Sequence, residues 1–219
     1  KKVVIFTAYT DTADFIYTEL CRKKFTQMVM VSGQEIKTTG NQSTSNFTEV
    51  LQSFAPYSKL YKECDWSDLY VQAELDRAKY FNDEKQRWEV NYDLWKELIR
   101  KYRSKTYRLL SDEINILIAT DCLSEGQNLQ DADMEINYDI HWNPVRLIQR
   151  FGRIDRIGSP NKLIRCVNFW PAKTFEEYLN LETRIVNRMT IMNLAGSETQ
   201  VINEQFQKMT ADNPLADKN

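Results

Sequence analysis

The chain has 219 residues, of which 29 are Lys or Arg and 31 are Asp or Glu, giving a formal net charge of -2. This length allows one substantial hydrophobic core, and the balanced charge excludes a global basic field, so any binding of nucleic acid must depend on local patches. No apolar run approaches the roughly 20 residues of a membrane-spanning helix, and four cysteines without paired spacing argue against a disulfide framework or a zinc site. We therefore expect a cytoplasmic protein without a membrane partner.

The first 33 residues are typical of a strand, a helix and a second strand. The run from Val3 to Phe6 is apolar and rich in β-branched residues, as in a strand buried on both faces. An amphipathic helix and a second apolar run, Met28 to Val31, follow, and this order predicts a parallel sheet. Thr7 and Tyr9 come directly after the first strand, at the edge where ligands of open α/β sheets bind. They are therefore candidate ligand contacts, and the alternative is an ordinary turn.

The block from Gln34 to Lys105 departs from this pattern. Thr, Ser, Asn and Gln dominate the segment from Gln34 to Pro56, which predicts a mobile loop. Aromatic and apolar residues then repeat at helical spacing, most clearly from Trp88 to Tyr102. We interpret this stripe as packing rather than as a platform for a ligand. The block is therefore predicted to be a mainly helical insertion that stands outside the sheet.

A basic segment closes this block. Arg100 to Arg108 contains five basic residues and two tyrosines but no acid. Basic and aromatic residues interleaved in this way can follow a nucleic-acid backbone, and Lys101, Arg103 and Lys105 are the candidate contacts. The alternative is the solvated cationic end of a helix, which the helix macrodipole favours.

The second half of the chain returns to the sheet pattern. Ile114 to Ala119 predicts a central strand, Met134 to Ile140 a further one and Leu163 to Phe169 another. The pattern Thr174-x-x-Glu177 is a capping box that opens a last helix. His141 is the only histidine, which argues against a histidine-based metal site or a catalytic triad.

Between two of these strands lies a helix that carries an unusual set of arginines. Asn143 and Pro144 suit its first positions. We predict that Val145, Ile148 and Phe151 pack against the protein and that a second face presents a row of donors, namely Arg146, Gln149, Arg150 and Arg153. Because arginine forms bidentate hydrogen bonds with phosphate oxygens, this row predicts a phosphate ligand. Gly152 costs about 1 kcal/mol relative to alanine inside a helix, which predicts a close approach there.

Three segments in this half resemble the last motifs of superfamily-two helicases in their Swi/Snf-type form. They are Ile116-Leu-Ile-Ala-Thr120-Asp-Cys-Leu-Ser124-Glu-Gly126-Gln-Asn128-Leu129, Trp142-Asn-Pro144 and Gln149-Arg-Phe-Gly-Arg153-Ile-Asp-Arg156-Ile-Gly158. Their order and spacing make the resemblance specific. It is nearest to a bacterial branch that associates with RNA polymerase, although Ser159 stands where many relatives have Gln. The resemblance thus implies a bacterial, nucleoid-associated protein for which RNA polymerase is a candidate partner.

The resemblance implies a RecA-like lobe: an α/β parallel sheet with helices on both faces, carrying the helical insertion. The expected domains are residues 1–33 with 106–196 as the lobe, residues 34–105 as the insertion and residues 197–219 as a polar tail. The implied roles are nucleic-acid contact for Thr7, Tyr9, Thr120 and Ser124, nucleotide contact for Gly126, Asn128 and Gln149, and arginine fingers for Arg153 and Arg156.

The sequence contains neither a phosphate loop nor an Asp-Glu pair after an apolar strand, which the first lobe of such motors provides. The chain also begins with Lys rather than Met, so we expect a piece of a longer protein. The resemblance then implies the C-terminal lobe of an ATP-dependent translocase on double-stranded DNA, with ATP between the two lobes and Mg²⁺ held chiefly by the other lobe. The alternatives are a lobe of a strand-separating DNA or RNA helicase and a non-catalytic adaptor. Alone, the chain is expected to be inactive.

Overall fold

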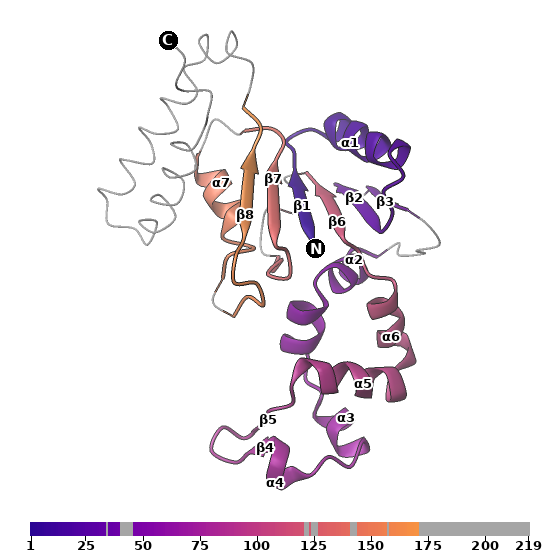
Figure 1. Cartoon of the computed structure of the whole chain (residues 1–219), viewed down its shortest axis with the longest axis vertical. Coiled ribbons are helices and arrows are strands. Elements are labelled where there is room, and N and C mark those ends of the chain that lie inside the picture. Colours follow the sequence, from indigo (N-terminus) through magenta and orange to yellow (C-terminus); the bar gives the residue numbers. More distant parts are fainter. Residues whose placement is uncertain are drawn as a thin grey trace, which may run out of the picture.

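The computed structural model describes residues 1–33, 35–39, 46–120, 123, 127–140, 144–156 and 158–170 (Figure 1). A six-stranded sheet forms its upper part and a helical block its lower part. The sheet contains β1 (Val3–Phe6), β2 (Met28–Ser32), β3 (Glu35–Thr38), β6 (Ile116–Ala119), β7 (Met134–Asn137) and β8 (Arg165–Asn168). The helices around it are α1 (Thr10–Arg22), α2 (Phe47–Phe54) and α7 (Pro144–Phe151).

The strand order is β3-β2-β6-β1-β7-β8, and every neighbouring pair is parallel except β2 and β3. The central position predicted for β6 is confirmed, because β6 lies between β1 and β2. The prediction that residue 34 begins a block outside the sheet is wrong for β3, which pairs with β2 through Val31 and Ile36. Part of the predicted mobile loop is therefore ordered as an edge strand.

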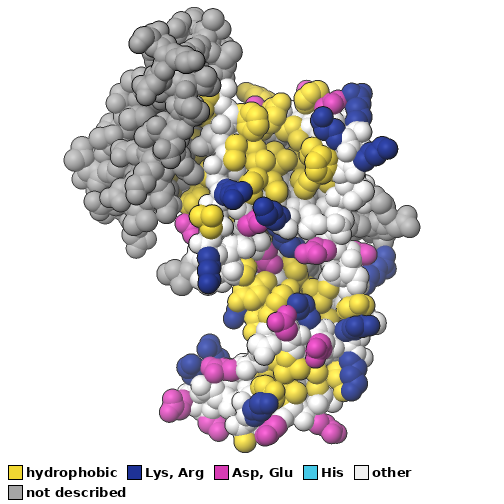
Figure 2. Space-filling model, in the orientation of Figure 1, with side chains coloured by type: hydrophobic (Ala, Val, Ile, Leu, Met, Phe, Trp, Pro, Cys, Tyr) yellow, Lys and Arg dark blue, Asp and Glu magenta, His cyan; other side chains and the backbone are white. Residues whose placement is uncertain are grey.

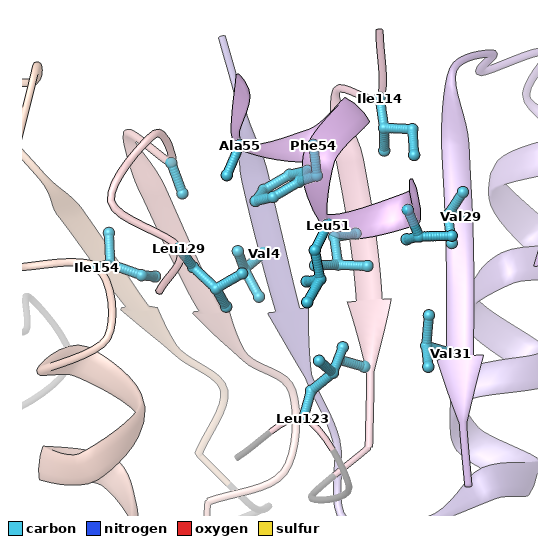
Figure 3. Packing of buried hydrophobic residues seen from close by; sticks show 14 of the residues in the cluster. Val4, Val29, Val31, Leu51, Phe54, Ala55, Ile114, Leu123, Leu129 and Ile154 are labelled. Atoms are coloured by element: carbon cyan, nitrogen blue, oxygen red, sulfur yellow. The ribbon is translucent and has the colours of Figure 1, made fainter. Parts of the chain in front are cut away.

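Successive residues of each central strand point to opposite faces of the sheet, and both faces are covered. Ile5, Met30 and Ile118 pack with α1 on one face. Val4 and Leu117 lie on the other face, where α2, the loop at Leu129 and the segment at Ile154 cover them (Figure 3). The predicted α/β fold with helices on both faces is thus confirmed. The predicted loop from Gln34 to Pro56 is also wrong for α2, because this helix packs into the hydrophobic core beside the sheet.

The helical block has its own hydrophobic core. Its elements are the π-helix η1 (Tyr57–Lys62), α3 (Ser67–Gln72), α4 (Arg77–Tyr80), the short strands β4 (Phe81–Asn82) and β5 (Arg87–Trp88), α5 (Tyr92–Tyr102) and α6 (Ser104–Ser111). Trp95, fully buried, stacks on Tyr92 with ring centroids 5.4 Å apart and meets Tyr61 and Trp66. The interpretation of the aromatic stripe as packing is confirmed.

The chain leaves the sheet and returns to it at the same place. The ammonium group of Lys2 donates to the carbonyl oxygen of Phe54 at 2.6 Å and to that of Ile114 at 3.5 Å, and it forms an ion pair with Glu113 at 3.0 Å. The amide of Ile114 also donates to the carbonyl of Ser53. Burial lowers the pKa of Lys2, and Glu113 partly offsets this effect.

No helix in the described part of the chain is long and apolar enough to cross a membrane.

Candidate nucleotide and nucleic-acid interface

Polar side chains gather where the parallel strands β1, β2, β6 and β7 end. Thr7, which follows β1, is fully buried, and its hydroxyl donates to the carboxylate of Asp139, which follows β7. The amide of Ala8 donates to the same carboxylate at 3.2 Å. Because Asp139 accepts this hydrogen bond, the Thr7 hydroxyl joins the ends of β1 and β7. Sequence reasoning missed Asp139, because the predicted strand ran from Met134 to Ile140, whereas β7 ends at Asn137.

The other predicted contacts at this edge differ in exposure. Tyr9 is 67 % exposed just before α1, so its ring and hydroxyl are accessible. Thr120 is buried, and its amide donates to the carbonyl of Val31 at 3.2 Å. Beside it, the hydroxyls of Thr10 and Ser32 lie 2.7 Å apart. Of the two sequence candidates near β1, Tyr9 is therefore the one that can reach a ligand.

The helix α7 presents a different face to the protein than the sequence predicted. Leu147 and Arg150 are buried, whereas Val145 and Ile148 are only partly covered. The predicted row of donors on one open face is therefore wrong for Arg150. Its exposed members are Arg146 and Gln149.

Arg150 lies inside a polar cluster formed with β7 and β8. Its Nη1 donates to Asn137 Oδ1 at 3.0 Å, and its guanidinium carbon lies 5.2 Å from the centre of the Phe6 ring. Asn137 Nδ2 donates in turn to Glu135 Oε1 at 2.8 Å and to Asn168 Oδ1 at 3.0 Å. These contacts tie the buried guanidinium to β7.

Glu135 is a fully buried carboxyl in the same cluster. Among the described residues its Oε2 has no hydrogen-bond partner. Burial raises the pKa of Glu135 to about 7, although the hydrogen bond from Asn137 and the charge of Arg150 oppose the rise. Burial likewise raises the pKa of the Cys166 thiol on β8. Glu135 therefore titrates near neutral pH.

The two predicted arginine fingers lie after the end of α7. Arg153 is partly exposed and Arg156 is exposed. The carbonyl of Arg153 accepts a hydrogen bond from the amide of Leu129 at 3.1 Å. This bond brings Arg153 next to Asn128, so two residues predicted to contact the nucleotide are on adjacent segments.

Two glycines accompany these arginines. The close approach predicted at Gly152, by a nucleotide or by a second lobe, stays a prediction; within this chain an added Cβ would meet backbone oxygens of the same helix, Ile148 at 3.3 Å and Gln149 at 3.9 Å. Gly152 lies just beyond the last residue of α7, so the loss of stability caused by glycine inside a helix does not apply to it. Gly158 has a φ of +94°, a backbone conformation that favours glycine.

The loop from Asn128 to Ala132 is joined to the helical block on its other side. Asn128 Nδ2 donates to Glu63 Oε1 at 3.2 Å. Asp131 accepts from the amides of Tyr57 and Ser58 at 2.8 and 2.9 Å and from the Ser58 hydroxyl at 2.5 Å. A buried carboxylate thus caps the first turn of η1. Burial raises the pKa of Asp131, and these hydrogen bonds oppose the rise.

Asn161 holds the same loop from the side of β8. Its side-chain amide donates to the carbonyls of Gln130, Asp131 and Ala132 at 3.0 to 3.3 Å. Sequence reasoning missed both Asp131 and Asn161, since each acts through contacts with residues far away in the chain.

The basic segment lies at the opposite end of the sheet from Thr120. The chain passes from α6 into β6 at the amino ends of the strands, whereas Thr120 follows the carboxyl end of β6 (Figure 1). The basic segment and Thr120, both predicted from the sequence to contact nucleic acid, therefore do not line one groove. Arg103 pairs with Asp68 at 2.6 Å and with Gln72 at 2.5 Å, while Lys101 and Lys105 are exposed.

On the face seen in Figure 2, basic and acidic side chains are interspersed rather than gathered into one basic patch. Gly126, Ser124, His141, Trp142, Asn143 and the predicted helix and tail beyond residue 170 lie outside the described residues. Within the described ranges, no group of His, Cys, Asp and Glu could hold a metal ion.

Residues 67–158 match the family model for the helicase conserved C-terminal domain. Over 71 residues the chain is 44 % identical to an uncharacterized ATP-dependent helicase, YqhH, of Bacillus subtilis, covering 32 % of this chain and 13 % of that protein. Over 104 residues it is 31 % identical to the ATP-dependent RNA helicase DBP8 of Lodderomyces elongisporus, covering 48 % of this chain and 22 % of that protein. The chain therefore spans less than a quarter of these two relatives.

Two solved structures are also similar. The C-terminal part of the Fun30 ATPase domain has a TM-score of 0.42 and 16 % identity, over 82 % of this chain and 38 % of that chain. Dbp5 of S. cerevisiae bound to RNA and ADP BeF3 has a TM-score of 0.40 and 15 % identity, over 84 % and 32 %. From the sequence matches we conclude that residues 67–158 contain a helicase conserved C-terminal domain.

Proposed function

We propose that the chain is the second motor lobe of an ATP-dependent nucleic-acid translocase, with double-stranded DNA as the favoured track. In this proposal ATP binds between this lobe and a phosphate-loop lobe of the same protein, which also holds Mg²⁺. Arg153 and Arg156 act as fingers that stabilise charge on the transferred phosphoryl group. Gln149, Asn128 and Gly126 contact the nucleotide.

The observation that carries the proposal is the hydrogen bond from Leu129 to Arg153, which joins the loop after β6 to the segment after α7. This bond brings together two motifs that are separated in the sequence. Close to this bond in the chain, Gln149 and Arg156 are exposed residues. Planar guanidinium groups suit bidentate contact with phosphate oxygens.

The preference for double-stranded DNA rests on the Swi/Snf-type sequence features, including Trp142-Asn-Pro144. A strand-separating RNA helicase is the second candidate, because the matched relative DBP8 is named an RNA helicase. The RNA polymerase partner and the bacterial, cytoplasmic and nucleoid setting likewise rest on the sequence resemblance alone.

The test is ATP hydrolysis by the protein that contains both lobes, with duplex DNA, single-stranded DNA and RNA as activators. We expect duplex DNA to activate most and strand separation not to occur. Arg153→Ala and Arg156→Ala should each lower kcat by about 10³-fold or more with a much smaller change in ATP affinity, since fingers act mainly on the transition state. Strong activation by RNA together with unwinding would favour the second candidate. Full turnover by both variants would refute the finger assignment.

A further inference from the structure

Helix α7 is attached to the sheet by a polar contact at a position where an apolar residue would ordinarily be found. Arg150 is fully buried in its last turn. A buried guanidinium needs partners, because burial of a charge without compensation is costly. Its Nη1 finds Asn137 on β7 at 3.0 Å.

Asn137 is itself held in one orientation. Its amide nitrogen donates to Glu135 Oε1 at 2.8 Å and Asn168 Oδ1 at 3.0 Å, which fixes the oxygen toward Arg150. The acceptors come from β7 and from the neighbouring strand β8, which pairs Asn137 with Asn168 in parallel register. The position of the Arg150 guanidinium is thus determined by two strands.

The segment that follows is close to this anchor. The amide of Arg153 donates to the carbonyl of Arg150 at 3.1 Å, and the carbonyl of Arg153 accepts from Leu129. A shift of Arg150 would therefore move Arg153 directly. Misplacement of a catalytic group by about 1 Å can cost about 100-fold in rate.

We propose that Asn137 and Arg150 are positioning residues that set the placement of Arg153, and that Arg150 does not bind phosphate itself. This inference rests on the proposed function of Arg153. It corrects the sequence-based expectation that all the arginines of α7 contact one anion.

The experiment measures kcat and KM for ATP in the two-lobe protein with its nucleic-acid activator. The variants are Asn137→Leu, Arg150→Lys and the milder Asn168→Ala, each made alone and combined with Arg153→Ala. We expect Asn137→Leu to lower kcat by about 10- to 100-fold with KM changed less than about threefold. In the Arg153→Ala background the same change should have almost no further effect on kcat, because the residue it positions is gone.

Val29→Ala is the matched control. Val29 is fully buried on β2, remote from α7 in the strand order, so its truncation loosens the core without touching the anchor. It should leave kcat unchanged at a temperature where all variants remain folded, as monitored by circular dichroism. If Asn137→Leu does not fold, Asn168→Ala should show a smaller loss of kcat that also disappears in the Arg153→Ala background.

Three outcomes would overturn the inference. Equal losses of kcat in both backgrounds would indicate a general structural effect. Unchanged kcat in Asn137→Leu and Asn168→Ala would show that the anchor is dispensable. A large rise in KM for Arg150→Lys that Asn137→Leu does not reproduce would make Arg150 a ligand of ATP. By contrast, full turnover of Arg153→Ala alone would refute the proposed function and not only the positioning role.

Discussion

The backbone amide of Leu129 donates a hydrogen bond to the carbonyl oxygen of Arg153 at 3.1 Å. Leu129 is fully buried against the sheet, so the bond connects Arg153 to the hydrophobic core. Because it uses only backbone atoms, it leaves the side chains of Asn128 and Arg153 to other contacts. The loop from Asn128 to Ala132 and the segment after α7 are therefore both connected to the core through Leu129.

The predicted contact of Asn128 with the nucleotide can be tested separately from its contact with the helical block. Its amide donates to Glu63 Oε1 at 3.2 Å and to Gln130 Oε1 at 3.2 Å. If Asn128 binds the nucleotide, Asn128→Ala should weaken ATP binding by about tenfold, equivalent to about 1.4 kcal/mol. Glu63→Ala removes the contact between Asn128 and the block, together with the ion pair between Glu63 and Lys59 at 3.1 Å, and should leave ATP affinity unchanged. Titration of a fluorescent ATP analogue into the two-lobe protein measures both, and equal affinities for the two variants would contradict the assignment of Asn128.

The basic segment of the helical block is proposed as a second contact with nucleic acid. Lys101 and Lys105 are exposed, whereas Arg103 is held by Asp68 and Gln72. We expect Lys101→Ala with Lys105→Ala to reduce the salt slope of binding by about 0.9 per lost phosphate contact. Arg103→Ala should change the slope less. Lys23→Ala with Lys24→Ala, at the end of α1, is the control, and a slope that both double variants leave unchanged would make the segment a solvated helix end.

Asp131 is expected to hold the helical block to the sheet. Asp131→Ala leaves the amides of Tyr57 and Ser58 without their acceptor in a buried place, which should cost about 2 to 4 kcal/mol of unfolding free energy. Ser58→Ala removes one donor and should cost about 1 kcal/mol. Ser53→Ala is a matched control, because the buried Ser53 hydroxyl has no hydrogen-bond partner among the described residues. Urea denaturation measures all three, and a stable Asp131→Ala protein would exclude this role.

Glu135 predicts a pH dependence of stability. Its pKa is raised from 4.5 to about 7 in the folded protein, so between these values the folded state binds more protons than the unfolded state. Stability should therefore fall as pH rises through this window, by up to about 3 kcal/mol. The charge facing Glu135 is the Arg150 guanidinium, which opposes the shift, whereas the Cys166 thiol on β8, whose own pKa burial raises, is neutral in this pH range.

Glu135→Gln keeps an oxygen for Asn137 and cannot ionise. The variant should have a flatter pH profile between pH 5 and 8 and should exceed the original protein in stability above pH 7. Urea midpoints across this range provide the measurement. Burial also raises the pKa of Asp131, so ionisation of Asp131 lowers the stability of both proteins as pH rises. This contribution is the same in both and does not affect the comparison. Parallel profiles for the two proteins would show that Glu135 ionises normally.

The strands of the sheet could be predicted because their signal is local. Ile5 and Ile118 belong to short apolar runs buried on both faces, which parallel strands require. The edge strand β3 escaped prediction because Ile36 is its only large apolar residue. An edge strand packs one face only, and its pairing with β2 depends on backbone hydrogen bonds that any sequence can form.

The candidate site was only partly predictable. The motifs located Arg153 and Asn128, and the structure adds that they lie on adjacent segments. The burial of Arg150 could not be predicted, because it depends on Asn137 and Glu135 from a strand whose position relative to α7 is not encoded in helical spacing. From the sequence alone, an arginine on a helix face could equally bind a ligand or donate to a buried acceptor. Only the position of the strand beside the helix decides between the two.

The bonds from Lys2 to the carbonyls of Phe54 and Ile114 have a consequence for how this fold can vary. They hold together the two points where the chain departs for the helical block and comes back. Segments whose ends lie this close are the places where domains accept insertion or excision of whole modules. Related chains can therefore carry a longer, shorter or unrelated module between these two points while every strand of the sheet keeps its register.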